Sequence, residues 1–168
     1  MPLDLSDLSN DKSVSDQEVI LAYGHVLEAL RNRGIIRTKN VVGELGERYC
    51  EMIFNQSSSL PNLTLVATNE QDIDAIDEAK TTYSIKTVTF TSAKRTGSFH
   101  LAEDHAPLDK RFDMLLVVIM NDTMTPRFIY RLSWNQFWSL KSWSSTQRAW
   151  YLRLSNTNLG AADMLFGG

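Results

Sequence analysis

The feature that most constrains this chain is a continuous apolar segment, Phe112–Met120, which contains the run MLLVVIM. The run is far too short to cross a bilayer, because a membrane-spanning helix needs about 20 apolar residues. A short continuous apolar run is typical of a strand that is buried on both faces. We therefore expect a central β-sheet with packed layers on both sides.

Helical patterns dominate the first third of the chain. Ser15 and Glu18 form a capping-box signature, and apolar residues follow them at helical spacing. With Gly34 as the stop signal, this pattern predicts a helix over about Asp16–Arg33. A second helix is predicted over about Gly43–Asn55.

Strand-like patterns follow the second helix. The predicted strands are Leu63–Ala67, Ile73–Ile76, Tyr83–Phe90, Phe112–Met120, Arg127–Leu132 and Ala149–Leu154. A second capping-box signature, Ser133 to Gln136, predicts a Trp-rich helix over Trp134–Trp143. This order of elements predicts an α+β fold, or an α/β fold with a mixed sheet.

Composition agrees with a folded domain. Of the 168 residues, 43% are hydrophobic and 22% are charged, which excludes wholesale disorder, collagen and coiled coil. We expect residues 1–14 to form a mobile acidic tail, and residues 15–168 to form one domain with a Trp-rich C-terminal extension. The single cysteine, Cys50, excludes an internal disulfide framework and a Cys-based zinc cluster. The first residues carry no secretory signal pattern, so the expected location is the cytoplasm, with no membrane association.

The charge is unevenly distributed. The net charge is −3, yet residues 1–30 alone hold six acids against one base, so the rest of the chain is slightly basic. A nucleic-acid partner is therefore compatible with the sequence. The basic residues that we name as candidate phosphate contacts are Arg37, Lys39, Lys94 and Arg95. A solvated basic turn is an equally good interpretation of the first two.

A predicted hairpin carries the most informative set of polar residues. If Ala79–Thr81 forms its turn, Asp74 lies roughly opposite Lys86, and alternation puts Ser84 and Lys86 on one face. A carboxylate beside a lysine suits phosphodiester hydrolysis, because the carboxylate can hold a divalent metal and the lysine can act on a water or stabilise the transition state. Magnesium is the expected ion, because it needs few carboxylates. Taken alone, the pattern also fits a surface hairpin with solvated charges.

A pair of glutamates opens the second predicted helix. Glu44 and Glu47 are three residues apart and therefore share a face of that helix. Acids at a helix N-terminus also complement the helix dipole, so the pair has a purely structural interpretation as well.

The ordered combination of these motifs resembles the restriction-endonuclease-like, PD-(D/E)xK nuclease superfamily. The resemblance covers roughly Leu27–Phe90, with local similarity to small bacterial members. The segments that carry it are Leu30–Asn40, Gly43-Glu44-x-x-Glu47, Asp74-Ala-Ile-Asp77, Tyr83-Ser-Ile-Lys86 and, later, Leu132-Ser-Trp-x-x-Phe137. The resemblance implies a restriction-endonuclease-like core with a central mixed sheet flanked by helices. It also implies that Asp74 is the metal carboxylate, Lys86 the catalytic lysine, and Glu47 or Glu44 the helix acid.

The sequence departs from the superfamily pattern in two ways. Ser84 stands where an acid is expected two residues before the lysine, so the metal site has one charged ligand fewer. The Ile85 carbonyl, a water, Glu47 or Asp77 would have to substitute. In addition, the core helix that usually follows the lysine strand has no clear counterpart between Phe90 and Phe112.

The C-terminal third is rich in aromatic residues. Trp134, Phe137, Trp138 and Lys141 recur at helical spacing, so core packing explains most of them. A functional interpretation is that some aromatic rings stack on bases, with Lys141, Arg148 and Arg153 on phosphates.

Together these features predict a Mg²⁺-dependent deoxyribonuclease, with Mn²⁺ as a substitute ion, acting in restriction, defence or DNA repair. Cutting both strands would favour a homodimer, because one such site cuts one strand. Ser84 motivates an alternative, a catalytically impaired nuclease fold that binds DNA or a protein. A third hypothesis is a subunit of a larger defence complex, with the acidic tail docking a protein partner. The choice between DNA and RNA stays open.

Overall fold

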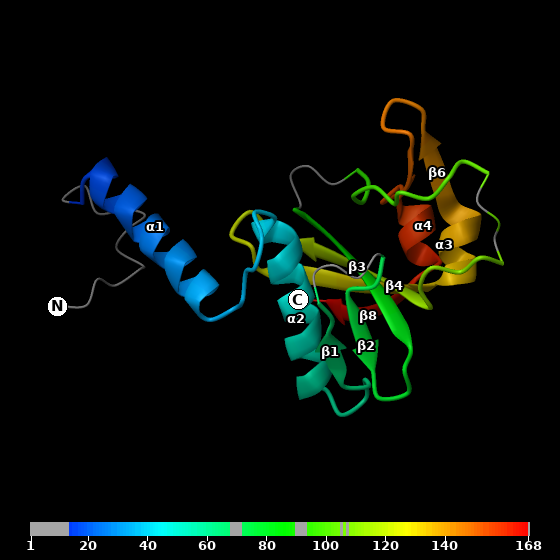
Figure 1. Ribbon diagram of the computed structural model, residues 1–168, viewed down its shortest axis with the longest axis horizontal. Coiled ribbons are helices and arrows are strands. Elements are labelled where there is room, and N and C mark those ends of the chain that lie inside the picture. The colour runs from blue at the N-terminus through cyan, green and yellow to red at the C-terminus, as the bar shows by residue number, and fades with distance from the viewer. Residues whose placement is uncertain (1–13, 68–71, 90–93, 105, 107, 168) are drawn as a thin grey trace. The chain divides into compact units, whose positions relative to one another are not determined.

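The computed structural model describes residues 14–67, 72–89, 94–104, 106 and 108–167 (Figure 1). The chain divides into two compact units, residues 1–39 and residues 40–168. The expected acidic tail and the end of the predicted strand at Phe90 lie almost entirely outside the described residues.

The first unit contains the helix α1 (Asp16–Asn32). The predicted capping box is confirmed, because the Ser15 side chain accepts from the Glu18 N–H while the Glu18 carboxylate accepts from the Ser15 N–H. Gly34, just beyond the helix, has φ of +66°, a left-handed conformation that glycine adopts without strain. No residue of α1 is buried, and its apolar side chains include exposed Ile20 and Tyr23.

The second unit is built on a six-stranded sheet. Its strands are β1 (Leu63–Leu65), β2 (Ala75–Asp77), β3 (Thr82–Thr89), β4 (Met114–Met120), β5 (Pro126–Ser133) and β8 (Asp163–Gly167). They lie in the order β1-β2-β3-β4-β5-β8. β3 and β4 are parallel, whereas all the other neighbours in this sheet are antiparallel (Figure 1). The prediction of a central mixed sheet is confirmed.

The strand β4 is buried on both faces, as its sequence predicts. Leu116, Val118 and Met120 pack into a core with Cys50 and Phe54 of the helix α2 (Val41–Gln56). The alternate residues Leu115, Val117 and Ile119 pack into a second core. Helix α3 (Trp134–Leu140) contributes to that core through Trp134 and Phe137. The sheet is therefore flanked by a helix on each face, which is the arrangement that the apolar run required.

The prediction of the Trp-rich helix is confirmed at its start and wrong at its end. The Ser133–Gln136 capping box is present, but the helix ends at Leu140, and Lys141–Ser144 forms the strand β6. β6 pairs with β7 (Ala149–Leu152) in a separate two-stranded sheet. The helical spacing misleads here because Lys141, although extended, still covers the Trp138 ring, with its Nζ 3.7 Å from the ring centroid.

Two short elements near the C-terminus escape sequence analysis. The helix α4 (Asn156–Gly160) has five residues, and the edge strand β8 is exposed or half-buried throughout. Neither segment shows the regular spacing of apolar residues that indicates a helix or a strand, because neither buries a whole side-chain face. Within the described residues, no helix is long and apolar enough to cross a membrane.

Candidate functional site

The β2–β3 hairpin positions Asp74 just before the start of β2. Ile76 pairs with Thr82, and Ala75 pairs with Tyr83. A hydrogen bond from the Asp77 N–H to the Thr81 C=O closes a three-residue loop, residues 78–80, between this pair. Its last residue, Lys80, has φ of +66°, as is common at the end of a three-residue hairpin loop.

This register corrects the expected position of Asp74. Continued by one residue, it aligns Asp74 with Ser84, not with Lys86. The Asp74 N–H instead donates to the Tyr83 C=O at 2.8 Å, so the ladder is irregular at this point. Sequence alone left the turn position open, and a turn centred one residue earlier moves every cross-strand partner by two positions.

The carboxylate of Asp74 is anchored to β3 through one oxygen. Its Oδ2 accepts a hydrogen bond from the Ile85 N–H at 2.6 Å, and the Ser84 Oγ lies 3.4 Å from the same oxygen. Among the described residues, none donates a hydrogen bond to Asp74 Oδ1. Asp74 therefore has one oxygen fixed by the protein and one available to a cation or a water.

Lys86 lies on β3 on the face opposite to α2. Tyr83 and Ile85 point into the core that contains α2, so the alternate residues Ser84 and Lys86 point to the other side of the sheet. Lys86 Nζ lies 4.9 Å from the centroid of the buried Phe99 ring. Within the described chain, no ion pair engages Lys86 Nζ. Its ammonium group is therefore held by an aromatic face and can still interact with an anionic ligand.

Glu47 reaches the site because α2 approaches β3 closely. A Cβ atom built on Gly46 would lie 1.8 Å from Thr87 Oγ1, so only glycine permits this packing. Thr87 follows Lys86 directly in β3, and Glu47 follows Gly46 directly in α2. Close contact at this one point brings the helix acid to the lysine strand.

Asp74, Glu47 and Lys86 line a single pocket of about 330 Å³. Ile85 also lines it, and its other walls are Asn40, Gly43, Thr87 and Gly97. The three charged residues come from a helix, a pre-strand position and a strand, and the fold brings them together. This pocket is our candidate active site.

The pKa of the Cys50 thiol is affected by two carboxylates that line this pocket. It is fully buried in the core between α2 and the sheet. Burial, and to a smaller extent the negative charges of Glu47 and Asp74, raise the pKa of the Cys50 thiol. The thiol therefore stays protonated and unreactive.

Three of the candidate catalytic or metal-binding residues, Ser84, Glu44 and Asp77, do not line the pocket. Ser84 is fully buried, and its hydroxyl lies beside Asp74. Glu44 is 4% exposed and does not line the pocket, so the structure favours Glu47 as the helix acid. Asp77 is 7% exposed and is held by the Thr81 N–H and the Tyr83 hydroxyl. Although burial opposes it, these hydrogen bonds lower the pKa of Asp77.

The basic candidates are spread over both units. Arg37 and Lys39 are exposed and belong to the first unit. Lys94 and Arg95 are exposed in the second unit, and the Arg95 guanidinium lies over the Tyr151 ring, 5.0 Å from its centroid. These four residues are therefore accessible to a phosphate, but none lines the pocket.

The segment 94–99 contributes Gly97 to the pocket lining, although its sequence gives no sign of this role. Residues 94–99 pair with β7 through bonds such as Phe99 N–H to Trp150 C=O at 2.7 Å. This pairing brings Gly97 into the pocket and the Phe99 ring next to Lys86. The segment is polar and has no period of its own, so its aromatic residue, Phe99, is the only signal that could have marked it.

Within the residues that the structure describes, no three His, Cys, Asp or Glu side chains are grouped closely enough to hold a metal ion. Comparison with known proteins adds no relative: no protein-family model matches the chain, and no curated protein matches it.

Proposed function

We propose that this chain is a metal-dependent endonuclease with a restriction-endonuclease-like core, which hydrolyses phosphodiester bonds in DNA. The observation that carries the proposal is the convergence of Asp74, Glu47 and Lys86 on one pocket. Two carboxylates and a lysine suit metal-assisted phosphodiester hydrolysis, because the carboxylates can hold the ion and the lysine can stabilise negative charge on the phosphate.

The order of elements supports the proposed core. The helix α2, which carries Glu47, precedes three antiparallel strands, and the third of these, β3, carries Lys86 and is parallel to β4. A helix that supplies an acid to a strand bearing the lysine is what the superfamily resemblance leads us to expect. A polar segment at 94–99 stands where the superfamily usually has a further helix.

The donor set fits Mg²⁺. Mg²⁺ is usually held by one or two carboxylates, and water and substrate phosphate complete its octahedron. Asp74 and Glu47 supply two carboxylates, and the Ile85 carbonyl is a candidate neutral ligand. Mn²⁺, which takes similar oxygen ligands, is the expected substitute. The bound ion would supply Lewis-acid polarisation of the phosphate.

The other roles in binding and hydrolysis are proposed for residues of the chain. Lys86 would position the attacking water or stabilise the negative charge that develops on the phosphate oxygens. The Phe99 ring would restrict its ammonium group without neutralising it. The Ile85 N–H would hold Asp74 in one orientation during turnover. Arg37, Lys39, Lys94 and Arg95 are proposed contacts to the DNA backbone.

A second candidate function rests on Ser84. With a buried serine in place of an acid, the site has two carboxylates where the superfamily has more. The chain would then be a catalytically impaired nuclease fold that binds DNA or a protein partner. As a binding module, the chain would act through a protein partner from a defence system or through DNA. As an active enzyme that cuts both strands, it would act as a homodimer.

The deciding experiment is a plasmid cleavage assay. Wild type and Lys86→Ala are incubated with supercoiled plasmid in Mg²⁺, in Mn²⁺ and with chelator. Lys80→Asn is the matched control, because it removes an exposed lysine from the same hairpin at a left-handed position that Asn tolerates. We expect metal-dependent nicking by wild type and Lys80→Asn, and none by Lys86→Ala. Equal nicking by all three proteins would refute the site, and no nicking of plasmid, single-stranded DNA or RNA would favour the binding function.

A further inference from the structure

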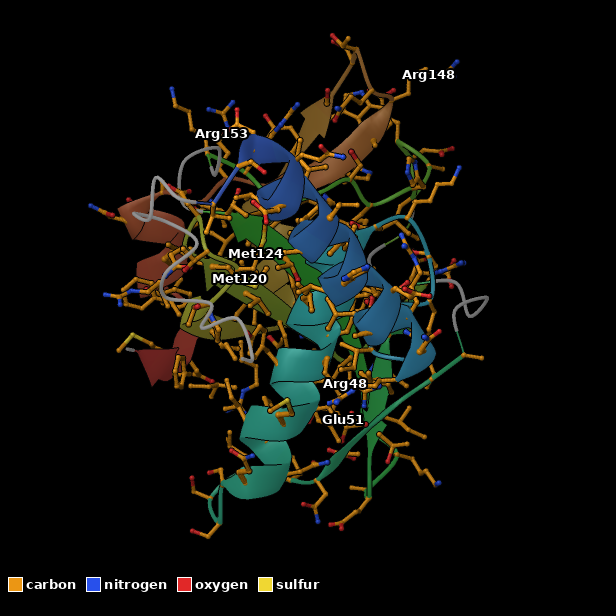
Figure 2. All side chains as sticks on the ribbon, turned by 90° about the vertical axis from the view of Figure 1, so that its left-hand side faces the viewer. Arg48, Glu51, Met120, Met124, Arg148 and Arg153 are labelled. Atoms are coloured by element: carbon orange, nitrogen blue, oxygen red, sulfur yellow. The ribbon has the colours of Figure 1, made fainter. Side chains whose placement is uncertain are left out.

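The second unit has another pocket that the proposed active site does not use. Its volume is about 550 Å³, which is within the range of small-molecule sites. It lies between residues 101–104 and the β6–β7 hairpin and is lined by Leu101, Ala102, Glu103, Asp104, Trp143 and Arg148. Figure 2 shows Arg148 at the outer end of this hairpin.

The indole of Trp143 is supported by a ring contact with Trp150. Its ring packs edge-to-face on Trp150, with 5.0 Å between the centroids. Trp150 in turn donates its indole N–H to the Ala102 C=O at 3.0 Å, which ties the hairpin to the 101–104 loop. The Ser98 hydroxyl and the Gln147 side chain add a second tie at the hairpin end, 3.0 Å apart. One wall of the pocket is therefore a preorganised aromatic surface.

The other walls carry both signs of charge. Glu103 and Asp104 are exposed acids on one side, and Arg148 is an exposed base on the other. A simple cation would meet the guanidinium of Arg148, and a simple anion would meet the two carboxylates. A ligand that pairs with the indole, the carboxylates and the guanidinium together has a flat aromatic face, hydrogen-bond donors at its edge and a negative charge. A nucleotide has these properties, with a base to stack, amino groups to donate and a phosphate to pair with arginine.

We propose that this pocket binds one unpaired nucleotide, with its base on Trp143, its donor edge on Glu103 or Asp104, and its phosphate on Arg148. Guanine is the favoured base, because its adjacent N1–H and N2–H groups match the two oxygens of a carboxylate. The inference deepens the proposed function, on which its choice of a nucleic-acid ligand rests. It adds a base-selective contact to the proposed cleavage of the phosphodiester backbone.

The pocket is linked to the candidate active site through a short series of contacts. Trp150, which supports Trp143, pairs through its main chain with Phe99. The Phe99 ring lies under Lys86 Nζ. A nucleotide in the pocket would thus stabilise the wall against which Lys86 rests.

The test is a titration with the four deoxynucleoside monophosphates in chelator, followed by NMR of the tryptophan indole N–H signals. Wild-type full chain is expected to bind dGMP most tightly, with the Trp143 signal shifting most, and dTMP at least threefold more weakly. Trp143→Ala should weaken dGMP binding about tenfold, in line with the loss of one stacked base. Equal affinity for all four nucleotides, or no binding at 10 mM (on the order of ten times the expected dissociation constant), overturns the proposal.

Further variants guard against loss of folding in Trp143→Ala. Arg148→Gln changes an exposed side chain at the end of the hairpin and should weaken dGMP binding several-fold while leaving thermal stability unchanged. Arg127→Gln is the matched control, since it removes an exposed arginine of β5 that does not line the pocket. Equal affinity of these two variants for dGMP would also overturn the proposal. Because nucleotide binding is read without metal or cleavage, its failure is distinct from failure of the plasmid assay.

Discussion

The Asp74 carboxylate is joined to the lysine strand by a hydrogen bond from the main-chain N–H of Ile85, 2.6 Å from Asp74 Oδ2. A charge-assisted bond of this kind fixes the orientation of the carboxylate without neutralising it. The donor belongs to the residue directly before Lys86, so the proposed metal ligand and the proposed catalytic lysine are held by one stretch of main chain. Their relative position therefore depends on β3 and not on side-chain packing alone.

Asp74→Asn should separate metal binding from folding. The amide oxygen of the substituted side chain can still accept from the Ile85 N–H, so the free energy of unfolding should change by about 1 kcal/mol or less in the absence of metal. The loss of the charge should weaken Mn²⁺ binding at least tenfold, measured by calorimetry. Asp163→Asn, at an exposed carboxylate, is the control and should bind Mn²⁺ as wild type does. Wild-type affinity in Asp74→Asn would show that the ion binds elsewhere.

Ser84→Asp should restore a charged ligand and lower stability. Ser84 is fully buried, with its hydroxyl 3.4 Å from Asp74 Oδ2, so a new carboxylate there would face a like charge in a low-dielectric setting. We expect the melting temperature in chelator to fall by several degrees and to recover in Mn²⁺, because a bound cation relieves the repulsion. Differential scanning calorimetry with and without Mn²⁺ measures both effects. Ser84→Asn, which has a similar shape and no charge, should show no such recovery, and an identical response of the two variants would contradict the prediction.

Local signals in the sequence predicted the elements that carry the site. Both capping boxes, the strand β4 and the two helices before the sheet could be recognised because each depends on residues close together in the chain. The pairing of residues 94–99 with β7 could not, since it joins segments about fifty residues apart through main-chain bonds that carry no side-chain signature. That pairing brings Gly97 and Phe99 to Lys86.

The choice between the two glutamates shows a second limit. Glu44 and Glu47 share a helix face in sequence terms, and helical spacing alone cannot separate them. What separates them is the contact between Gly46 and Thr87, which sets how α2 lies on β3. Further along the same helix, the half-buried side chains of Arg48 and Glu51 form an ion pair (Figure 2), so neighbouring charges of α2 have distinct structural roles.

Gly46→Ala should impair both stability and activity. The added Cβ would meet the Oγ1, Cγ2 and Cβ atoms of Thr87, all closer than 3.0 Å, and α2 would have to move away from β3. Overpacking of this kind costs about 1–3 kcal/mol, and a displaced Glu47 should lower the cleavage rate further. Urea unfolding and the plasmid assay measure the two effects.

Gly24→Ala is the matched control for this substitution. Gly24 also lies within a helix, but a Cβ there would meet no atom within 4 Å. Helix propensity alone should then stabilise the protein by about 0.5–1 kcal/mol. Wild-type stability of Gly46→Ala would contradict the packing that brings Glu47 to the pocket, whereas destabilisation by Gly24→Ala would show only that helix propensity does not decide the outcome at Gly24.

Asp77 should make the stability of the hairpin depend on pH. Its pKa is lowered in the folded protein because, against the opposing effect of burial, the Thr81 N–H and the Tyr83 hydroxyl stabilise its charge. A carboxylate whose pKa is lower when folded adds stability above its unfolded pKa, which is about 3.9, and that stability is lost as the pH falls through the folded pKa. Asp77→Asn should therefore cost about 1–3 kcal/mol at pH 7 and progressively less below about pH 4. Urea unfolding of both proteins between pH 3 and pH 7 measures this difference, and Asp163→Asn, at an exposed site, should show almost none. A difference between wild type and Asp77→Asn that stays constant over this range would mean that the charge of Asp77 does not stabilise the hairpin.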